Sequence, residues 1–277
     1  MTARLIELER GVVGVTAHGD PAARRVVLLC HPTPGASDFD PDPVVTGAGD
    51  VRLVGADRPG YGSTSAAIAE AGVPEAAELA ALDEAVQAGA HIAGVVGWGF
   101  GGLIALRVAA ARPEHVRRVA VVQAPRPRSK LNGLVARRSR AWMLQHNDPT
   151  MALAALHGGT HIEALSVLGV RRADPDLRQP GVPERLGRML SDAARGGLTG
   201  VAFDRRAQRR GDWNDIAGRV RARTLVVHGE RDPRIGPADA RWFRRRLDRA
   251  EVETVIEAGP LSIVTYWARI LEFAVRG

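Results

Sequence analysis

The sequence predicts an α/β fold, with a mostly parallel eight-stranded sheet flanked by helices and a helical cap inserted into it. Apolar, β-branched runs alternate with helix-patterned segments through most of the 277 residues, which is typical of a parallel sheet with crossover helices. This alternation lapses between about 126 and 212, where no strong strand pattern appears. With 45% hydrophobic residues, the chain is also large enough for one sizeable core.

Eight segments have strand character. The first two, RLIELE (4–9) and GVVGVTA (11–17), carry short apolar runs and are expected to open the sheet as an antiparallel pair. The other six are nearly continuous apolar runs, as expected for strands buried on both faces. They are RVVLLC (25–30), VRLVGA (51–56), IAGVVGW (92–98), RVAVVQ (118–123), TLVVHG (224–229) and VETVIE (252–257).

Helical patterns fill the intervals between these strands. In the segment 74–89, Leu79, Leu82 and Val86 recur at helical spacing. Further helices are expected over 102–114, 237–250 and 262–275, and within the insertion over 139–159 and 183–197. The predicted domains are therefore a core of 1–125 and 213–277 and a helical cap of 126–212.

Composition narrows the class of protein. The N-terminal stretch lacks the continuous apolar segment of a signal peptide, and no run is long enough to span a bilayer, so we expect a cytoplasmic protein that does not bind membranes. Cys30 is the single cysteine and is expected to be a small buried residue. No cofactor and no metal site are expected.

The net charge of +7 comes almost entirely from arginine, because Lys130 is the only lysine. Abundant Ala, Gly and Arg are typical of GC-rich bacterial coding. Acidic residues are interspersed among the arginines, which favours a solvated surface over a nucleic-acid groove. No nucleic-acid partner is expected, although the runs over 126–140 and 205–210 are suited to attract an acidic ligand or partner.

The segment GVVGWGFGG (94–102) has the form of a nucleophile elbow, G-x-S-x-G, except that Gly99 stands at the central position. Four other motifs follow predicted strands in order. They are HPTPGAS (31–37), ADRPGYGSTS (56–65), HGERDP (228–233) and EAGPLSIV (257–264). Together the five motifs resemble, over nearly the whole chain, the α/β-hydrolases of the proline-iminopeptidase and epoxide-hydrolase-like branch.

The resemblance implies a catalytic triad in the chain order Ser, Asp, His. Carried onto this sequence, the nucleophile position is Gly99, the acid position is Asp232 and the histidine position is Pro260. Glycine offers no nucleophile, and the saturated ring of proline cannot act as a general base. Two of the three groups are therefore missing together, while the flanking Gly97 and Gly101 keep the tight turn that the fold needs.

The resemblance also implies an oxyanion hole formed by the backbone N–H groups of Thr33 and Phe100. Two interpretations stay open: these donors anchor a carbonyl or carboxylate, or the turn is unused and partly filled by Phe100. Asp232 is likewise either a pocket carboxylate or a turn residue before Pro233. The candidate pocket residues are His31, Trp98, Phe100, Asp232 and Leu261.

Other reactive side chains fit less well. His157 and His161 have the i, i+4 spacing of a metal pair, but Gly158 and Gly159 lie between them and weaken a helix there. The hydroxyls of the 31–37, 56–65 and 257–264 motifs are not placed in an elbow. His31 and His228 are expected to be structural.

Three hypotheses for the function remain. The leading one is a pseudoenzyme that binds a small molecule or partner in a capped pocket without turnover. The second is a divergent hydrolase, lyase, isomerase or cyclase that uses Asp232, pocket dipoles or a cap histidine. The third is a structural subunit paired with an active paralogue, for which an exposed apolar patch on the cap or final helix would argue. Whether the chain forms homo-oligomers is left open.

Overall fold

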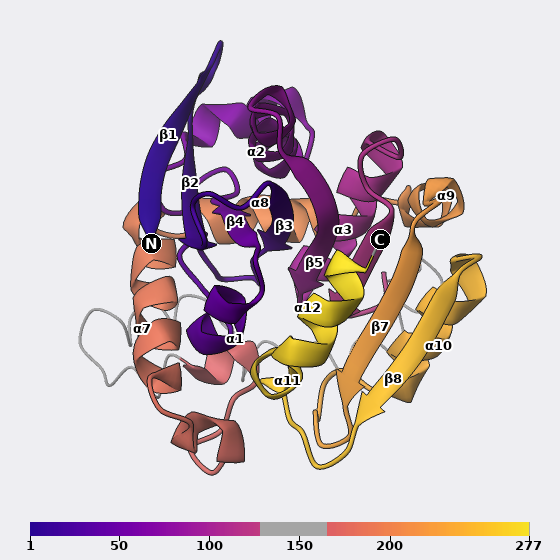
Figure 1. Cartoon of the computed structure of the whole chain (residues 1–277). Coiled ribbons are helices and arrows are strands. Elements are labelled where there is room, and N and C mark those ends of the chain that lie inside the picture. The colour runs from indigo at the N-terminus through magenta and orange to yellow at the C-terminus, as the bar shows by residue number, and fades with distance from the viewer. Residues whose placement is uncertain (128–164, 277) are drawn as a thin grey trace.

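The computed structural model describes residues 1–127 and 165–276, and its centre is one eight-stranded sheet (Figure 1). The strand order is β1-β2-β4-β3-β5-β6-β7-β8. The pairs β1–β2 and β2–β4 are antiparallel and all the others are parallel, which confirms the predicted architecture. The strands are β1 (Thr2–Leu8), β2 (Gly11–Gly19), β3 (Arg25–Cys30), β4 (Arg52–Ala56), β5 (His91–Trp98), β6 (Arg118–Val122), β7 (Arg223–Gly229) and β8 (Ala250–Val255).

The burial of each strand follows its residue pattern. The central strands β3 to β7 are buried along nearly their whole length, as their unbroken Val, Leu and Ile runs require. The edge strand β1 carries two charged residues, Arg4 and Glu7, among its apolar ones and stays largely exposed, with Leu5 56% exposed. The sheet thus separates two apolar clusters, one on each face.

Helices cover both faces of the sheet. On one face lie α1 (Pro43–Ala48), α11 (Ser262–Thr265) and α12 (Trp267–Val275), in front of the strands in Figure 1. On the other face lie α2 (Ala76–Gln87), α3 (Phe100–Ala111), α9 (Trp213–Arg219) and α10 (Pro237–Arg246). The short 3₁₀ helix η1 (Ala66–Ala71) precedes α2.

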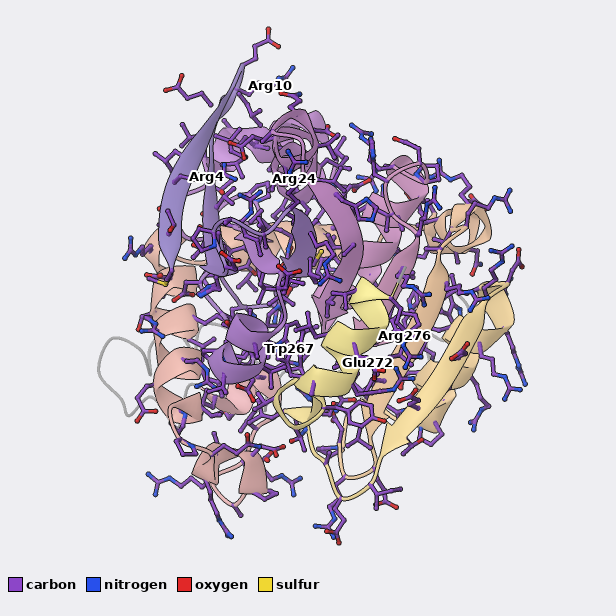
Figure 2. All side chains as sticks on the ribbon, in the orientation of Figure 1. Arg4, Arg10, Arg24, Trp267, Glu272 and Arg276 are labelled. Atoms are coloured by element: carbon purple, nitrogen blue, oxygen red, sulfur yellow. The ribbon has the colours of Figure 1, made fainter. Side chains whose placement is uncertain are left out.

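The last helical segment differs from its prediction. The segment 262–275 forms two helices, α11 and α12, because Tyr266 leaves the helical conformation with φ −106° and ψ 13°. In Figure 2, Trp267, Glu272 and Arg276 mark the course of α12. The buried Trp267 donates from its indole Nε1 to the Thr46 hydroxyl at 2.9 Å, so this residue joins the final helix to α1.

Among the described residues, three α-helices were not predicted from the sequence. In α1, Asp42 accepts hydrogen bonds from the Val44 and Val45 N–H groups, and Pro43 is the first helical residue. These two residues favour a helix start, but the segment has no apolar periodicity from which the helix could be predicted. The other two are α8 (Thr199–Gln208) and α9. Helix α10 ends at Arg246 instead of 250, because Ala250 already belongs to β8.

The described part of the predicted cap, residues 165–212, is helical. It contains α7 (Val182–Ala193), α8 and the short 3₁₀ helices η3 (Ser166–Leu168), η4 (Pro175–Arg178) and η5 (Ala194–Gly196). Apolar side chains of α7 belong to the same cluster as the α1 and α12 face of the sheet. Residues 128–164, which include His146, His157 and His161, lie outside the described residues, so the boundaries of the cap stay a prediction.

The sequence contains no run long enough to span a bilayer, and the helices of the structure can be compared with that prediction. Within the described ranges, none of the helices combines the length and the apolar character that a bilayer span requires.

Candidate functional site

The predicted triad positions lie at one edge of the sheet. Gly99 follows β5, Asp232 follows β7 and Pro260 follows β8. These strands and β6 are neighbours and run parallel, so their carboxyl ends lie along the same edge. This is the edge at which open α/β sheets place their ligand sites.

The turn after β5 has the backbone of a nucleophile elbow. Gly99 has φ 60° and ψ −126°, and its N–H donates to the Val122 carbonyl at 2.9 Å. A Cβ at Gly97 would overlap the carbonyl oxygen of Gly101, and one at Gly101 would overlap backbone atoms of the 30–31 segment. A Cβ at Gly99 would meet nothing closer than Pro32 Cβ at 3.4 Å. Packing therefore requires the flanking glycines, whereas the central position has room for a side chain.

Asp232 is held as a turn carboxylate. Its Oδ1 accepts from the Arg234 N–H at 2.7 Å and the Ile235 N–H at 3.2 Å, and its Oδ2 accepts from Gln123 Nε2 at 2.8 Å. Burial raises the pKa of Asp232, against the opposing effect of the Arg234 N–H. The carboxylate that would orient a catalytic histidine is thus bonded to an amide instead.

Gln123 was not singled out from the sequence. It follows β6, is buried, and joins the loops after β7 and β8. Besides its bond to Asp232, its Nε2 donates to the Gly259 carbonyl at 2.8 Å, and its Oε1 accepts from the Gly229 N–H at 3.0 Å. It has φ 49°, a conformation that costs a non-glycine residue roughly 1–2 kcal/mol. The only sequence signal was a polar residue ending an apolar strand run.

Pro260, at the histidine position, is buried beside Leu261. A carboxylate of the 165–212 region reaches this loop, because a Cβ at Gly259 would lie 2.9 Å from Asp174 Oδ2. Burial raises the pKa of Asp174, and the Asp232 charge acts in the same direction. The loop that would carry an imidazole therefore lies close to Asp174 at Gly259 and is connected to Asp232 only through Gln123, which bonds to both Gly259 and Asp232.

The two predicted oxyanion donors, Thr33 and Phe100, differ in their side chains, but in each the backbone N–H group has no hydrogen-bond acceptor among the described residues. The Phe100 ring packs edge-on against Trp213, with ring centroids 6.1 Å apart. Gly99 itself is partly exposed, while its neighbours Trp98 and Phe100 are each 3% exposed.

A buried ionic network lies beneath Thr33. Asp204 of α8 accepts from Arg58 Nε at 2.8 Å and Nη2 at 2.7 Å, from the Tyr61 hydroxyl at 3.0 Å, and from the Thr33 hydroxyl. Arg58 and Asp204 side chains are both fully buried. Helix α8 is thereby joined to the loop that carries a predicted oxyanion donor.

Glu78 is the remaining acid of this network. It is fully buried, lies 3.6 Å from Arg58 Nη1, and has no hydrogen-bond partner on either carboxylate oxygen among the described residues. Burial raises its pKa to about 8. Because Asp204 already neutralises Arg58 through two short bonds, we assign Glu78 as a neutral carboxylic acid at pH 7.

The described histidines of the motifs have hydrogen-bond partners other than Asp232. His31 lies beneath the Thr33 loop, with Nδ1 2.8 Å from the Pro32 carbonyl and Nε2 accepting from the Arg58 N–H at 3.1 Å. Burial lowers the pKa of His31 well below its usual range, so the ring is neutral. His228 Nε2 lies 3.3 Å from the Thr254 hydroxyl. Neither ring forms a hydrogen bond with Asp232 in the described part of the chain.

The remaining pocket candidates, Trp98 and Leu261, are buried in the same apolar cluster. Trp98 packs against Phe39 with ring centroids 5.3 Å apart. Two of the motif hydroxyls are engaged elsewhere, Ser37 with Thr16 at 2.9 Å and Thr64 with the Gly14 N–H at 2.9 Å, whereas the buried Ser262 hydroxyl has no hydrogen-bond partner among the described residues. Among the described residues, no cluster of three or more His, Cys, Asp or Glu side chains is suited to a metal ion.

The family model described as alpha/beta hydrolase fold matches residues 25–265. The chain therefore belongs to the α/β-hydrolase fold family. Comparison with curated proteins finds no match.

Solved structures of this fold resemble the whole chain. An alpha/beta hydrolase fold protein from Nakamurella multipartita is 23% identical with a TM-score of 0.64, covering 100% of both chains. The enol-lactonase from Burkholderia xenovorans LB400 is 18% identical with a TM-score of 0.69, covering 98% of each chain. An epoxide hydrolase from Vigna radiata is 17% identical with a TM-score of 0.71, covering 99% of this chain and 96% of the other. Similarity at this level establishes the fold and no more.

Proposed function

We propose that this protein is a non-hydrolytic member of the α/β-hydrolase fold family that binds a small carbonyl or carboxylate compound. The proposal rests on one observation: the elbow backbone is present, but the side chains that would perform hydrolysis are absent. The elbow conformation at Gly99 is present, yet a hydroxyl at Gly99 and an imidazole at Pro260 are both missing. A cytoplasmic location and a cap over 126–212 belong to the same proposal.

The backbone donors support a ligand with an acceptor oxygen. Phe100 directly follows the partly exposed Gly99, and Thr33 directly follows Pro32, whose Cβ would lie 3.4 Å from a Cβ at Gly99; neither N–H has a protein acceptor among the described residues. Phe100 also begins helix α3, where the partial positive charge of the helix N-terminus favours an anion. A carbonyl or carboxylate oxygen satisfies both donors.

The same geometry argues against ester hydrolysis. Nucleophile and base act as a unit, so losing both removes the triad contribution, and an oxyanion hole alone supplies about 10³–10⁴-fold over water. We expect no labelling by a fluorophosphonate probe and no turnover of activated esters beyond a heat-denatured control. Robust labelling of the wild-type chain at any serine would refute the proposal and identify the nucleophile.

Adding a serine at position 99 and a histidine at position 260 tests whether the surrounding backbone still supports a catalytic triad. Gly99→Ser has room for its side chain, since the nearest atom to a Cβ is 3.4 Å away. The double variant Gly99→Ser with Pro260→His should gain fluorophosphonate labelling at the new serine, while each single variant stays near background. Equal labelling of Gly99→Ser alone would show that another group acts as the base.

Ligand binding is tested by thermal shift with small carboxylates, esters and ketones. A ligand that binds only the native state stabilises it by RT ln(1 + [L]/Kd), about 2.7 kcal/mol at 100 times Kd. Gly99→Leu, which fills the space between the two donors, should abolish the shift. Gly197→Leu is the matched control, because Gly197 also has positive φ (63°) and its Cβ would meet nothing within 4 Å.

A second candidate is a divergent enzyme, and one observation favours it. Asp174 and Asp232 both have pKa values raised by burial and both contact the Gly259 loop, one of them through Gln123. A pair of such carboxylates can exchange a proton with a bound substrate. Asp174→Asn and Asp232→Asn should each abolish any turnover found in a substrate screen. Unchanged turnover in both variants would dismiss this candidate.

The structural-subunit alternative finds no apolar patch on the final helix, while Leu198 of the predicted cap is 41% exposed and residues 128–164 of that cap lie outside the described residues. The final helix buries Trp267, Ile270, Leu271 and Phe273, and the exposed large apolar residues of the described ranges lie elsewhere. A mixed oligomer or homo-oligomer remains testable by light scattering of the purified chain.

A further inference from the structure

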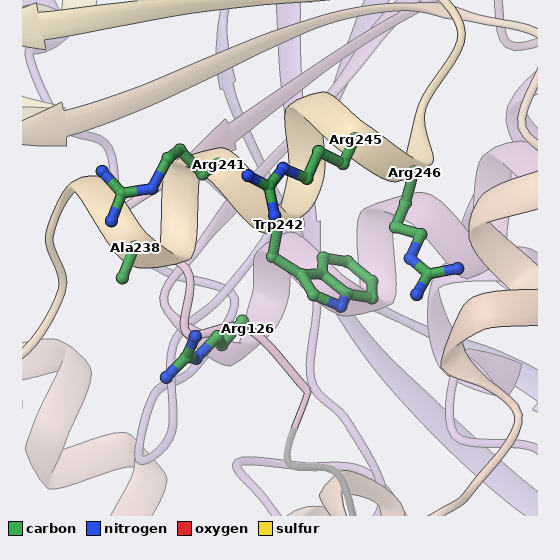
Figure 3. Close-up of a pocket in the computed structure, with 6 residues that line it drawn as sticks. All are labelled: Arg126, Ala238, Arg241, Trp242, Arg245 and Arg246. Carbon is green, nitrogen blue, oxygen red and sulfur yellow. The ribbon is translucent and has the colours of Figure 1, made fainter.

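A cavity of about 310 Å³ lies against helix α10 (Figure 3), and Gly99, Asp232 and Pro260 are not among the residues that line it. Its lining residues share a strongly cationic character around one aromatic ring. They are Arg126, Ala238, Arg241, Trp242, Arg245 and Arg246. In Figure 3 the Trp242 indole projects from the middle of α10, between Arg246 on one side and Arg126 on the other.

The helix presents these residues on one face. Positions 238, 241, 242, 245 and 246 follow the i, i+3, i+4, i+7, i+8 spacing of a single helical stripe. Phe243, on the opposite face, is fully buried in the core. Arg244 is exposed but does not line the cavity. The sequence of α10 therefore gathers three arginines and the tryptophan at the cavity.

These arginines lack anionic partners. Within the described residues, Arg241, Arg245 and Arg246 form no ion pair, in contrast to Arg107, Arg112 and Arg269, which do. Arg126 approaches one acid, with its Nε 4.0 Å from Asp239 Oδ1. Asp239 Oδ1 also accepts from the Arg126 N–H at 3.0 Å. Four guanidinium groups thus share one cavity with a single carboxylate at its edge, so the cavity attracts an anion carrying more than one charge.

Trp242 adds a flat apolar surface to this positive field. Its ring packs edge-on against Phe243, with centroids 5.0 Å apart at 90°, and the residue is only partly buried. An inorganic anion would not use such a surface. A planar heterocycle, in contrast, stacks favourably on an indole face.

We propose that this cavity binds a nucleoside polyphosphate, with the base on Trp242 and the phosphates on Arg126, Arg241, Arg245 and Arg246. Bidentate hydrogen bonds from guanidinium groups match phosphate oxygens, and a cavity of this size lies at the lower end of the range for small ligands. All four arginines line a single cavity of about 310 Å³, which suits a mononucleotide better than a nucleic-acid duplex. This site is independent of the function proposed for the Gly99 edge.

The test uses the full-length protein and isothermal titration calorimetry with ATP and GTP. The comparison probes are adenosine, inorganic tripolyphosphate and a 20-base-pair DNA duplex. We expect at least one nucleotide to bind in the micromolar range, and to bind at least tenfold more tightly than adenosine and tripolyphosphate. Arg241→Gln and Arg245→Gln should each weaken that binding tenfold or more, and Trp242→Leu should weaken it about fivefold or more.

Arg244→Gln is the matched control, because it removes the same charge from the same helix but outside the cavity. Its affinity should stay within twofold of wild type. A loss equal to that of Arg245→Gln would show general charge attraction and overturn the proposal. Tripolyphosphate binding as tightly as both nucleotides, tight binding of the duplex alone, or no nucleotide binding would each overturn it as well. Circular dichroism of each variant verifies that the fold is kept.

Discussion

The turn after β5 and the loops after β7 and β8 meet at one edge of the sheet, but they are held in different ways. In the turn, backbone packing dictates glycine at positions 97 and 101 and leaves position 99 free. In the loops, a side chain outside the triad, Gln123, bonds to Asp232, Gly259 and Gly229. Neither region depends on a reactive group for its shape. The backbone at this edge is therefore stabilised by atoms other than a hydroxyl at position 99 or an imidazole at position 260.

The largest effect is expected in the turn. Gly101→Ala places a methyl group onto backbone carbonyl oxygens of residues 30 and 31, which cannot move without distorting β3. We expect a loss of more than about 4 kcal/mol or failure to fold. Gly99→Ala should cost only about 1–2 kcal/mol for its positive φ. Urea denaturation followed by circular dichroism measures both, and equal losses would contradict the contrast.

The ionic network under Thr33 should rank next. Asp204→Ala leaves the guanidinium of Arg58 buried without its main partner, which costs about 3–5 kcal/mol. The control is Asp83→Ala, which breaks the partly exposed pair with Arg112 and should cost about 0–1 kcal/mol. A loss below 1 kcal/mol for Asp204→Ala would show that α8 is not anchored through this residue.

Gln123→Leu tests whether this side chain holds the loops after β7 and β8. The variant removes three hydrogen bonds and leaves buried partners without them, so we expect a loss of about 2–3 kcal/mol. Gln87→Leu, at an exposed position that ends α2, should change stability by less than about 0.5 kcal/mol. If Gln123→Leu behaves like Gln87→Leu, the loops are held by something other than this side chain.

The smallest effect, taken per pH unit, is expected from Glu78. Glu78 has a folded-state pKa of about 8 against an ordinary 4.5, so between these values the folded state holds a proton that the unfolded state releases. The free energy of unfolding should then fall as pH rises through this window, by up to about 1.4 kcal/mol per pH unit. Glu78→Gln should flatten the profile between pH 6 and pH 8 in urea titrations. An unchanged slope would mean that Glu78 is ionised in the folded protein.

Some of the site could be predicted from the sequence because it depends on local patterns. The glycine spacing over 97–101 indicated the elbow, and the motifs ending at Asp232 and Pro260 follow strands whose order along the chain matches their order at the edge. The packing partner of the Phe100 ring could not be predicted in this way, because Trp213, which the ring contacts, is distant in sequence.

The sequence by itself determined the eight strands, the alternation of helices and the absence of a hydroxyl at Gly99 and an imidazole at Pro260, because residue type and short-range periodicity suffice for these features. Only the tertiary structure decided which polar groups meet. Arg58 and Asp204 are 146 residues apart, and Gln123 and Asp232 are 109 apart. Such pairs form because burial leaves a polar group no water to bond, so each must find its partner wherever the folded chain brings one.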